Sequence, residues 1–162
     1  MHPWIVLQLL IVIAAANGAP VVAKKIFGDR YAKPLDGGAK FTDGRPVFGP
    51  SKTFRGLVAA VFAAAVAAPL VGLSPAVGVV AGAGAMTGDL ISSFVKRRMG
   101  KASSSRATGL DQIPESLIPL FLCAFLVGLS IVDIVIGTIV FMLGEMILSP
   151  LLFRLGIRSR PY

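Results

Sequence analysis

A carboxylate, two hydroxyls and an ammonium group are spaced along one apolar segment so that a helix would bring them to one face. Asp89 is followed by Ser92, Ser93 and Lys96, at spacings of three, four and seven residues, and these spacings fall on the same side of an α-helix. Such a set could bind Mg²⁺ and a phosphate group, because carboxylates suit the ion and an ammonium suits phosphate oxygens. It could equally be a polar stripe that reaches the membrane interface or packs against a basic neighbour. The residues alone leave both interpretations open.

Four other acids lie near or inside apolar segments. Asp111 stands just outside a helix that Pro114 predicts to begin near residue 113, because proline suits the first turn. Glu115 falls in that first turn, where the helix dipole favours an acid without any further role. Glu145 is embedded in an apolar run, where it could pair with a basic side chain, stay protonated or join the site. Asp133, near a predicted turn, is most simply a solvated residue at a helix end.

A polar segment between the first two apolar blocks is rich in glycine and basic residues. Glycines let a backbone approach a ligand closely, and Lys and Arg complement phosphate oxygens. Gly49, Lys52 and Thr53 resemble part of a P-loop, but Lys52 has no glycine before it and an apolar helix follows, so that motif is excluded. The charge could also serve only to orient the chain in a membrane. Asn17, inside the first apolar block, would need a hydrogen-bond partner.

The elements that must position these residues are predicted to be membrane helices. The chain has 162 residues, of which 55% are hydrophobic and only 15% charged, and the apolar residues form long blocks typical of a protein dissolved in a bilayer. At about 1.5 Å per residue each block is long enough to cross a hydrocarbon layer of about 30 Å. We therefore expect an all-α, polytopic membrane protein: a single domain, 1–162, built as a five-transmembrane-helix bundle. The predicted helices are 3–23, 56–73, 75–95, 113–129 and 131–153, with two cytoplasmic loops at 24–55 and 96–112.

The distribution of basic residues predicts the orientation. All 16 Lys and Arg lie in the two loops and the C-terminal tail, which five spans place on one side, and the positive-inside rule makes that side cytoplasmic. The expected location is the cell (inner) membrane, multi-pass, with the N-terminus outside and the C-terminus and site inside. No basic residue precedes the first block, so we interpret it as a retained anchor rather than a signal peptide. Small residues spaced four apart in the third span predict close helix contacts; they are Gly78, Gly82, Gly84 and Gly88.

Residues that are scarce exclude whole classes of chemistry. Cys123 is the only cysteine and His2 the only histidine, so one chain cannot form a disulfide framework, a thiolate metal cluster, a Ser-His-Asp triad or a histidine zinc site. Carboxylates, hydroxyls, lysines and arginines remain to carry any reaction.

Several runs together resemble the CDP-archaeol synthase family, which is similar to phosphatidate cytidylyltransferases. They are Asn17-Gly18-Ala19-Pro20, the loop 44–56 (GRPVFGPSKTFRG), 88–98 (GDLISSFVKRR) and Leu110-Asp111-Gln112. The resemblance covers essentially the whole chain and its five helices. It implies Mg²⁺-dependent transfer of CMP from CTP to a membrane lipid phosphate, with release of pyrophosphate. In that family the lipid is unsaturated digeranylgeranylglyceryl phosphate.

The resemblance also implies roles for individual residues. Asp89 and Asp111 map onto metal-binding acids, and with Lys96 they form the predicted catalytic set. The predicted substrate-binding residues are Asn17, Lys52, Thr53, Arg55, Ser92, Ser93 and Arg97. The chain departs from the family pattern at Pro114, where a second acid is usual, and at Ser51, where histidine is common.

Three other functions remain alternatives. The same reaction on diacyl phosphatidic acid is the nearest, because both lipids require only an apolar groove. A small transporter or channel would use Asp89 and Glu145 to line a path. A non-catalytic scaffold for anionic lipids would rest on the net charge of +8 alone. The expected partners are CTP, a membrane lipid phosphate and the bilayer, and no nucleic acid.

Overall fold

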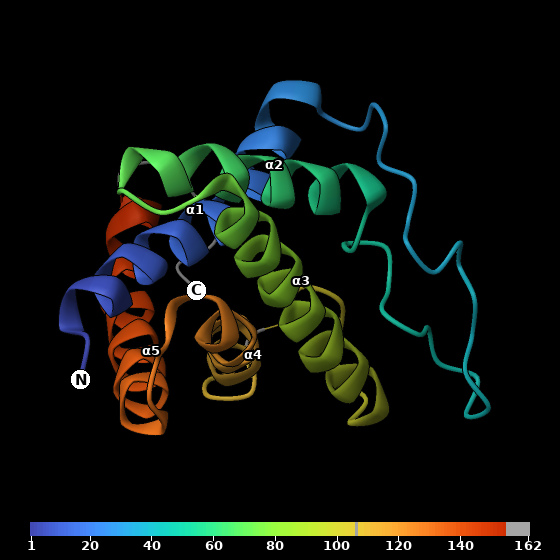
Figure 1. Ribbon diagram of the computed structural model, residues 1–162. Coiled ribbons are helices and arrows are strands. Elements are labelled where there is room, and N and C mark those ends of the chain that lie inside the picture. Colours follow the sequence, from blue (N-terminus) through green and yellow to red (C-terminus); the bar gives the residue numbers. More distant parts are fainter. Residues whose placement is uncertain (106, 155–162) are drawn as a thin grey trace.

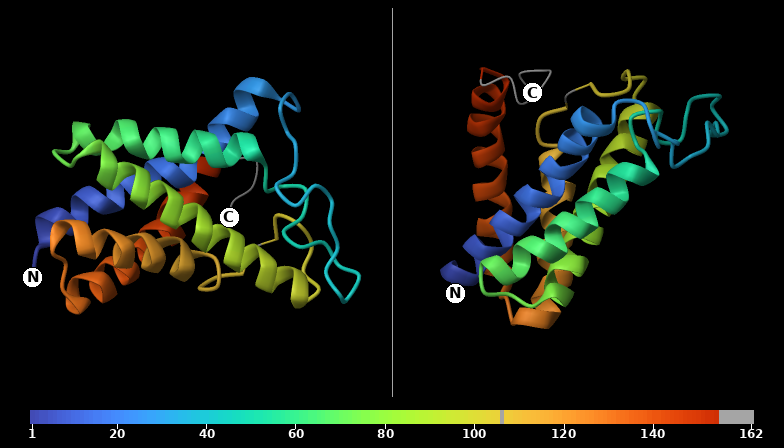
Figure 2. Two further views of the ribbon diagram at one scale, coloured as in Figure 1. Left: turned by 45° about the vertical axis from the view of Figure 1, so that its right-hand side comes forward. Right: turned by 90° about the horizontal axis from the view of Figure 1, so that it is seen from above.

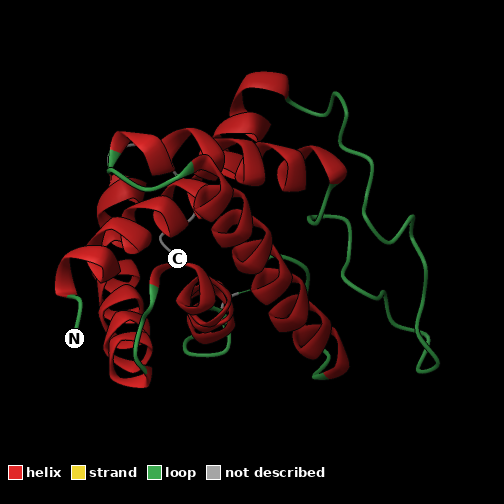
Figure 3. Cartoon of the chain, viewed as in Figure 1, coloured by secondary structure: helices red, strands yellow, loops and turns green. Residues whose placement is uncertain are grey.

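The computed structural model describes the backbone of residues 1–105 and 107–154 and the side chains as far as Leu148. Within these residues the chain forms five helices and no strands, as predicted (Figures 1 and 3): α1 Pro3–Phe27, α2 Phe54–Leu70, α3 Pro75–Arg98, α4 Gln112–Val127 and α5 Ile131–Arg154. The predicted basic tail after residue 154 lies outside the described residues.

The first helix is longer than the sequence predicted. It was expected to end at residue 23, but it continues through Pro20 to Phe27 and stops at Gly28, whose φ of 56° suits glycine. At about 1.5 Å per residue, a helix of this length exceeds the apolar thickness of a bilayer. Lys24 and Lys25 occupy its last turn. The helix is therefore long enough for its basic end to reach beyond the apolar layer.

Apolar side chains cover the outside of the bundle. α1, α3 and residues Ile131–Leu148 of α5 are long and apolar enough to cross a membrane, whereas α2 and α4, with 17 and 16 residues, are shorter. Phe62 on α2 and Phe125 on α4 are 69% and 77% exposed. Large apolar side chains facing outward in such numbers require an apolar solvent. The protein is therefore membrane-embedded.

The middle helix, α3, packs against α2 through glycines. A Cβ atom added at Gly78 would overlap the carbonyl oxygen of Ala64, and one added at Gly82 would lie 2.9 Å from Cα of Val61. These distances are too short for any side chain. The small residues therefore allow the two helix backbones into contact, as their spacing predicted.

The opposite face of α3 packs against α4 in the same way. A Cβ atom at Gly84 would lie 2.8 Å from Cα of Pro119, and one at Gly88 would overlap the carbonyl group of Pro114. α3 thus lies between α2 and α4 (Figure 1). Because Gly88 touches the first turn of α4, its neighbour Asp89 is held beside that turn.

The two ends of the bundle differ in character. Figure 2 shows both long loops, 28–53 and 99–111 without residue 106, at one end, and the N-terminus with the short turns 71–74 and 128–130 at the other. The described Lys and Arg side chains belong to the loops and to the helix ends that flank them. The bundle therefore has one strongly basic end.

Asp133 was predicted to be solvated, and this is wrong. Its side chain is 2% exposed. It accepts hydrogen bonds from the backbone N–H of His2 (2.8 Å) and from the N–H and hydroxyl of Ser130 (3.0 and 2.6 Å). The carboxylate caps the start of α5 and links the N-terminus to the α4–α5 turn. His2 and Asp133 are 131 positions apart in the chain, so the sequence did not indicate this contact.

We predict that Gly88→Ala destabilises the protein by about 1–3 kcal/mol, because the added methyl group meets the backbone of α4. The measurement is the midpoint of thermal unfolding in detergent. Gly18→Ala in α1 is the matched control, since no atom lies within 4 Å of its added Cβ, and it should be neutral or slightly stabilising. Equal midpoints for the two variants would contradict the packing described for α3.

Candidate active site

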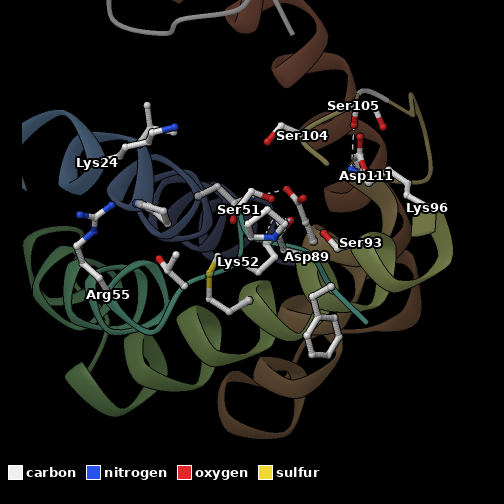
Figure 4. A pocket seen from close by; sticks show the side chains of 18 of the residues that line it. Lys24, Ser51, Lys52, Arg55, Asp89, Ser93, Lys96, Ser104, Ser105 and Asp111 are labelled. Atoms are coloured by element: carbon white, nitrogen blue, oxygen red, sulfur yellow. Dashed lines mark hydrogen bonds and ion pairs between the residues drawn. The ribbon is translucent and has the colours of Figure 1, made fainter. Parts of the chain in front are cut away.

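A cavity of about 720 Å³ opens at the basic end of the bundle (Figure 4). Residues from α1, α3, α4, α5, both long loops and the start of α2 line it. Nine of the ten predicted site residues are among them: Asn17, Lys52, Thr53, Arg55, Asp89, Ser93, Lys96, Arg97 and Asp111. Residues separated by as many as 94 positions in the chain thus meet at one cavity.

Ser92 is the predicted residue that the structure does not bring to the cavity lining. Its side chain is fully buried, and its hydroxyl donates a hydrogen bond to the backbone carbonyl of Asp89 (3.0 Å). Ser93, one position further round α3, does line the cavity. Helical spacing placed both serines on the same side of α3 as Asp89. It did not predict that Ser93 faces the cavity while Ser92 faces the protein interior.

Asp89 and Lys52 form an ion pair at the centre of the site. The Lys52 ammonium donates to both carboxylate oxygens of Asp89, at 2.6 and 2.5 Å. Both side chains are about one-fifth exposed, at 22% for Lys52 and 20% for Asp89. Lys52 belongs to the loop that precedes α2, and Asp89 to the second half of α3. The pair therefore joins the first long loop to the middle helix.

Asp111 and Lys96 form a second ion pair on the α4 side of the cavity. The Lys96 ammonium lies 2.6 Å from Oδ1 of Asp111 and donates to the carbonyl of Ser105 (3.1 Å). Oδ2 of Asp111 accepts the backbone N–H of Ala107 (2.8 Å). Asp111 immediately precedes α4 but makes no capping bond to it. It holds the second long loop instead.

Three further acids, Asp29, Glu115 and Glu145, line the cavity although none of them was among the ten predicted site residues. Glu115 accepts a hydrogen bond from the side-chain amide of Asn17 (3.1 Å) and interacts with the carboxylate of Asp89 and the ammonium of Lys52. Glu145 reaches the same cavity from α5. The amide in α1 was expected to need a partner, and Glu115 is that partner. Asn17 and Glu115 each lie in an apolar segment, where a polar side chain needs a partner. That shared need was the sequence signal that could have predicted their contact.

The donor set suits a divalent cation with few protein ligands. The described residues contain no cluster of three or more acid, histidine or cysteine side chains able to hold a metal. Mg²⁺ usually takes one or two protein carboxylates and fills its other positions with water and phosphate oxygens. Both oxygens of the Asp89 carboxylate face a positive charge, the ammonium of Lys52. In the structure, however, Asp89 and Asp111 are each paired with a separate lysine.

Two arginines line the cavity and brace the loops at the same time. Arg55 donates to the carbonyls of Gly28 (2.9 Å) and Arg30 (2.5 Å), so it fixes the end of α1 against the start of α2. Arg97 donates to the carbonyl of Ala102 (2.7 Å). The Nε atom of each guanidinium is buried and has no hydrogen-bond partner within the described residues. Each therefore keeps donor capacity.

Asp36 shapes the part of the first loop that delivers Lys52. Its carboxylate accepts the backbone N–H groups of Phe48 (3.0 Å), Gly49 (2.8 Å) and Gly38 (3.0 Å). Burial raises the pKa of this carboxyl, but the three N–H donors outweigh burial and hold the pKa below its ordinary value. The loop is therefore folded around the charged carboxylate of Asp36, which holds the backbone at Gly49, three residues before Lys52.

Arg98 attaches the tip of the same loop to the end of α3. Its guanidinium forms an ion pair with Asp43 (2.6 Å) and donates to the carbonyl of Pro46 (2.5 Å). It also lies over the rings of Phe41 and Phe94, at 4.8 and 4.9 Å from their centroids. A planar cation can make these hydrogen bonds and ring contacts together. We call Arg98 and its four partners, Phe41, Asp43, Pro46 and Phe94, the Arg98 latch.

Comparison with known proteins identifies relatives of the whole chain. The family profile described as CarS-like, CDP-archaeol synthase, matches residues 4–80 and 74–162. The CDP-archaeol synthase of Hyperthermus butylicus is 39% identical over 122 residues, 70% of each chain. That of Sulfolobus acidocaldarius is 33% identical over 80% of this chain and 83% of its own. The CDP-archaeol synthase of Sulfurisphaera tokodaii is 31% identical over 97% of this chain and 94% of its own.

A solved structure has the same fold. It is described as an intramembrane enzyme for archaeal membrane lipids biosynthesis, and it superimposes with a TM-score of 0.70 at 30% sequence identity. The match covers 88% of this chain and 90% of that one. The five-helix arrangement is therefore shared with an enzyme that works inside a membrane.

We predict that Arg98→Ala loosens the first loop without unfolding the bundle, because the latch contacts only the loop and the end of α3. Loss of its charge-assisted hydrogen bonds should raise the rate of limited proteolysis between residues 40 and 47 about tenfold. Lys101→Ala is the control, as Lys101 is an exposed cation in the neighbouring loop. Equal cleavage rates in the two variants would show that the latch does not hold the loop.

Proposed function

The chain belongs to the CDP-archaeol synthase family, and we propose that its basic-end cavity is the site where CMP passes from CTP to a lipid phosphate. As a member of that family it is a CTP-dependent cytidylyltransferase of archaeal lipid synthesis. The lipid proposed is unsaturated digeranylgeranylglyceryl phosphate, and the product is the corresponding CDP-lipid. The observation that carries the assignment of the site is the convergence of nine predicted residues from distant segments on one cavity.

The reaction needs no nucleophile from the protein. An oxygen of the lipid phosphate bonds to the α-phosphorus of CTP, and the bond from that phosphorus to the bridging oxygen of the β-phosphate breaks. Pyrophosphate leaves with the electron pair. The attacking oxygen is already anionic, so no base has to remove a proton. The absence of a histidine other than His2 is therefore no obstacle.

The cavity must instead balance a large negative charge. CTP and a lipid phosphate together bring four phosphate groups, and charge grows on the oxygens as the α-phosphorus is attacked. We assign Lys52, Lys96 and Arg97 to these phosphate oxygens, with Arg55 and Thr53 at the loop side of the cavity. Ser93 and Asn17 supply neutral polar contacts to the substrates.

Mg²⁺ is the proposed metal, and Asp89 and Asp111 are its proposed ligands. The ion would supply positive charge to phosphate oxygens when bound. Asp89 is the better supported of the two, since it already accepts an ammonium on both oxygens. Glu115, which interacts with Asp89, is a further carboxylate within reach of the same position. It takes the place of the acid that the family pattern usually has one residue earlier.

The geometry favours an enzyme over a transporter or channel. A conducting path would need polar groups along the length of the bundle. The charged cavity residues lie at one end, while the middle of the bundle is packed with fully buried apolar side chains: Leu9, Val12, Ile13, Ala64, Ala81 and Leu120. Within the described residues the polar region therefore ends partway into the bundle.

We further propose that all five helices cross the membrane, with the N-terminus outside. α2 and α4 cover about 25 Å by helical rise, and Val71–Leu73 and Gly128–Leu129 extend their apolar runs toward the outer turns. The long basic loops then lie in the cytoplasm, which supplies CTP, while the lipid arrives from the bilayer. The cavity is at the boundary between the two.

We predict that Asp89→Asn lowers the rate of CDP-lipid formation by at least about 100-fold, because the charge that binds the cation is lost. Purified protein is incubated with Mg²⁺, labelled CTP and either the isoprenoid ether lipid phosphate or diacyl phosphatidic acid, and the products are identified by mass spectrometry. Asp133→Asn, at the far end of the bundle, is the control. Full activity of Asp89→Asn would refute the metal assignment, and faster turnover of phosphatidic acid would refute the lipid.

The orientation can be tested with single cysteines, since the one native thiol, Cys123, is buried. We expect a membrane-impermeant maleimide added to intact cells to label Ser74→Cys, in the outer α2–α3 turn, and not Thr42→Cys, in the first loop. Both positions are exposed. After the cells are broken, both should react. The reverse pattern in intact cells would show that the basic end faces outward.

A further inference from the structure

The basic side chains that line the cavity are not equivalent. Within the described residues, Lys52 is paired with Asp89 and Lys96 with Asp111. Arg55 and Arg97 donate to backbone carbonyls of the loops. Lys24, the remaining basic residue of the lining, makes no hydrogen bond or ion pair through its ammonium with any residue among 1–105 and 107–148. Among the basic side chains that line the cavity in the described part of the chain, Lys24 is the one whose charged group has no hydrogen-bond or ion-pair partner.

The position of Lys24 differs from that of the other cations as well. Figure 4 shows Lys24 and Arg55 on one side of the Lys52–Asp89 pair, and Lys96 with Asp111 on the other. The two sides could therefore receive two different phosphate-bearing substrates. The Lys52–Asp89 pair lies between them.

Lys24 also lies where a bilayer lipid would present its phosphate. It is the first charged side chain after 21 uncharged positions of α1, Pro3–Ala23. Val22 and Ile26, on either side of it in the chain, are 50% and 69% exposed on the apolar outside of the helix. A lysine at such a boundary extends its amine toward water and phosphate while its stem stays in apolar surroundings. The other cavity cations come from the loops and from α2 and α3.

General effects of charge account for part of this observation. Cations are favoured in the last turn of any helix, because they interact with its dipole, and they orient membrane chains. Both effects apply equally to Lys25, which is also exposed in the last turn of α1. Only Lys24 lines the cavity. The helix dipole and the orientation of the chain in the membrane therefore do not explain why Lys24 lines the cavity and Lys25 does not.

We propose that Lys24 binds the phosphomonoester of the lipid substrate and so defines the lipid side of the cavity, with the nucleotide phosphates on the side of Lys96 and Arg97. This inference rests on the proposed function, since it assigns one substrate to one part of that site. It also gives the reaction its direction. The attacking phosphate approaches from α1, and pyrophosphate leaves toward the second loop.

The test compares Lys24→Ala with Lys25→Ala, which remove the same charge from adjacent positions of one helix. Initial rates are measured in micelles of an uncharged detergent, varying the lipid phosphate at saturating CTP and then CTP at saturating lipid. We expect Lys24→Ala to raise the KM for the lipid at least about tenfold, the effect of losing one charge-assisted hydrogen bond. Its KM for CTP should stay within about twofold of wild type. Lys25→Ala should change neither, and Lys24→Arg should recover most of the lipid affinity.

Other outcomes would overturn the proposal. A raised KM for CTP in Lys24→Ala would place the nucleotide on the α1 side, and equal effects in the two alanine variants would reduce the role of Lys24 to bulk surface charge. No change in Lys24→Ala would remove the role entirely. Thermal unfolding midpoints show whether each variant is folded.

A binding measurement separates this inference from the proposed function. Retention of radiolabelled lipid phosphate by immobilised protein, without CTP, should fall in Lys24→Ala and not in Lys25→Ala. If wild-type protein made no CDP-lipid, the proposed function would fail. The retention assay would still decide whether Lys24 binds the lipid phosphate, and equal retention by wild type and Lys24→Ala would refute it.

Discussion

The backbone contacts of α3 with both of its neighbours are the constraint on which the rest of the structure depends. Glycines on one face admit α2, and glycines on the other admit α4, so the three helices approach more closely than larger side chains would permit. In a bilayer, where lipid is as apolar as the helix surface, such packing is a main source of helix association. Because Gly88 is in contact with the first turn of α4, Asp89 necessarily faces Glu115 and the cavity. The position of the site is thus a consequence of helix packing.

Charge balance is the second constraint at this end of the bundle. An isolated carboxylate near hydrocarbon is costly, by about 2.5–3.5 kcal/mol even on insertion scales. The structure offsets that cost by pairing Asp89 with Lys52 and Asp111 with Lys96. Each pair also joins segments that are separate in the chain or fixes a loop to a helix. The same side chains that bind phosphates and a cation in the proposed reaction therefore hold the loops at the cavity. Stability and chemistry share these groups.

The two long loops are ordered by side chains rather than by regular secondary structure. Asp36 collects backbone N–H groups of the first loop, and the Arg98 latch attaches its tip to α3. Arg97 fixes the second loop through Ala102. Many of the basic residues on this face thus have structural partners, so their abundance is not a measure of substrate binding. Lys52, Arg55, Lys96 and Arg97 have such partners although they line the cavity, and among the lining cations of the described residues only Lys24 has none.

The sequence by itself determined the helical class, the approximate helix ranges, the separation of charge to one end and most of the polar residues that line the candidate cavity. These follow from local properties: runs of apolar residues, helical spacing and the positions of Lys and Arg. Tertiary structure decided which side chains meet. It brought Glu115 to Asn17 and Asp89, although the helix dipole alone would favour an acid in that first turn. It turned Ser92 away from the cavity, buried Asp133 against the N-terminus, and separated Lys24 from Lys25. The physical reason is that these outcomes depend on helix rotation and on contacts between segments far apart in the chain. Helix packing determines the rotation of each helix and the contacts between distant segments. The spacing of residues along one segment does not determine either.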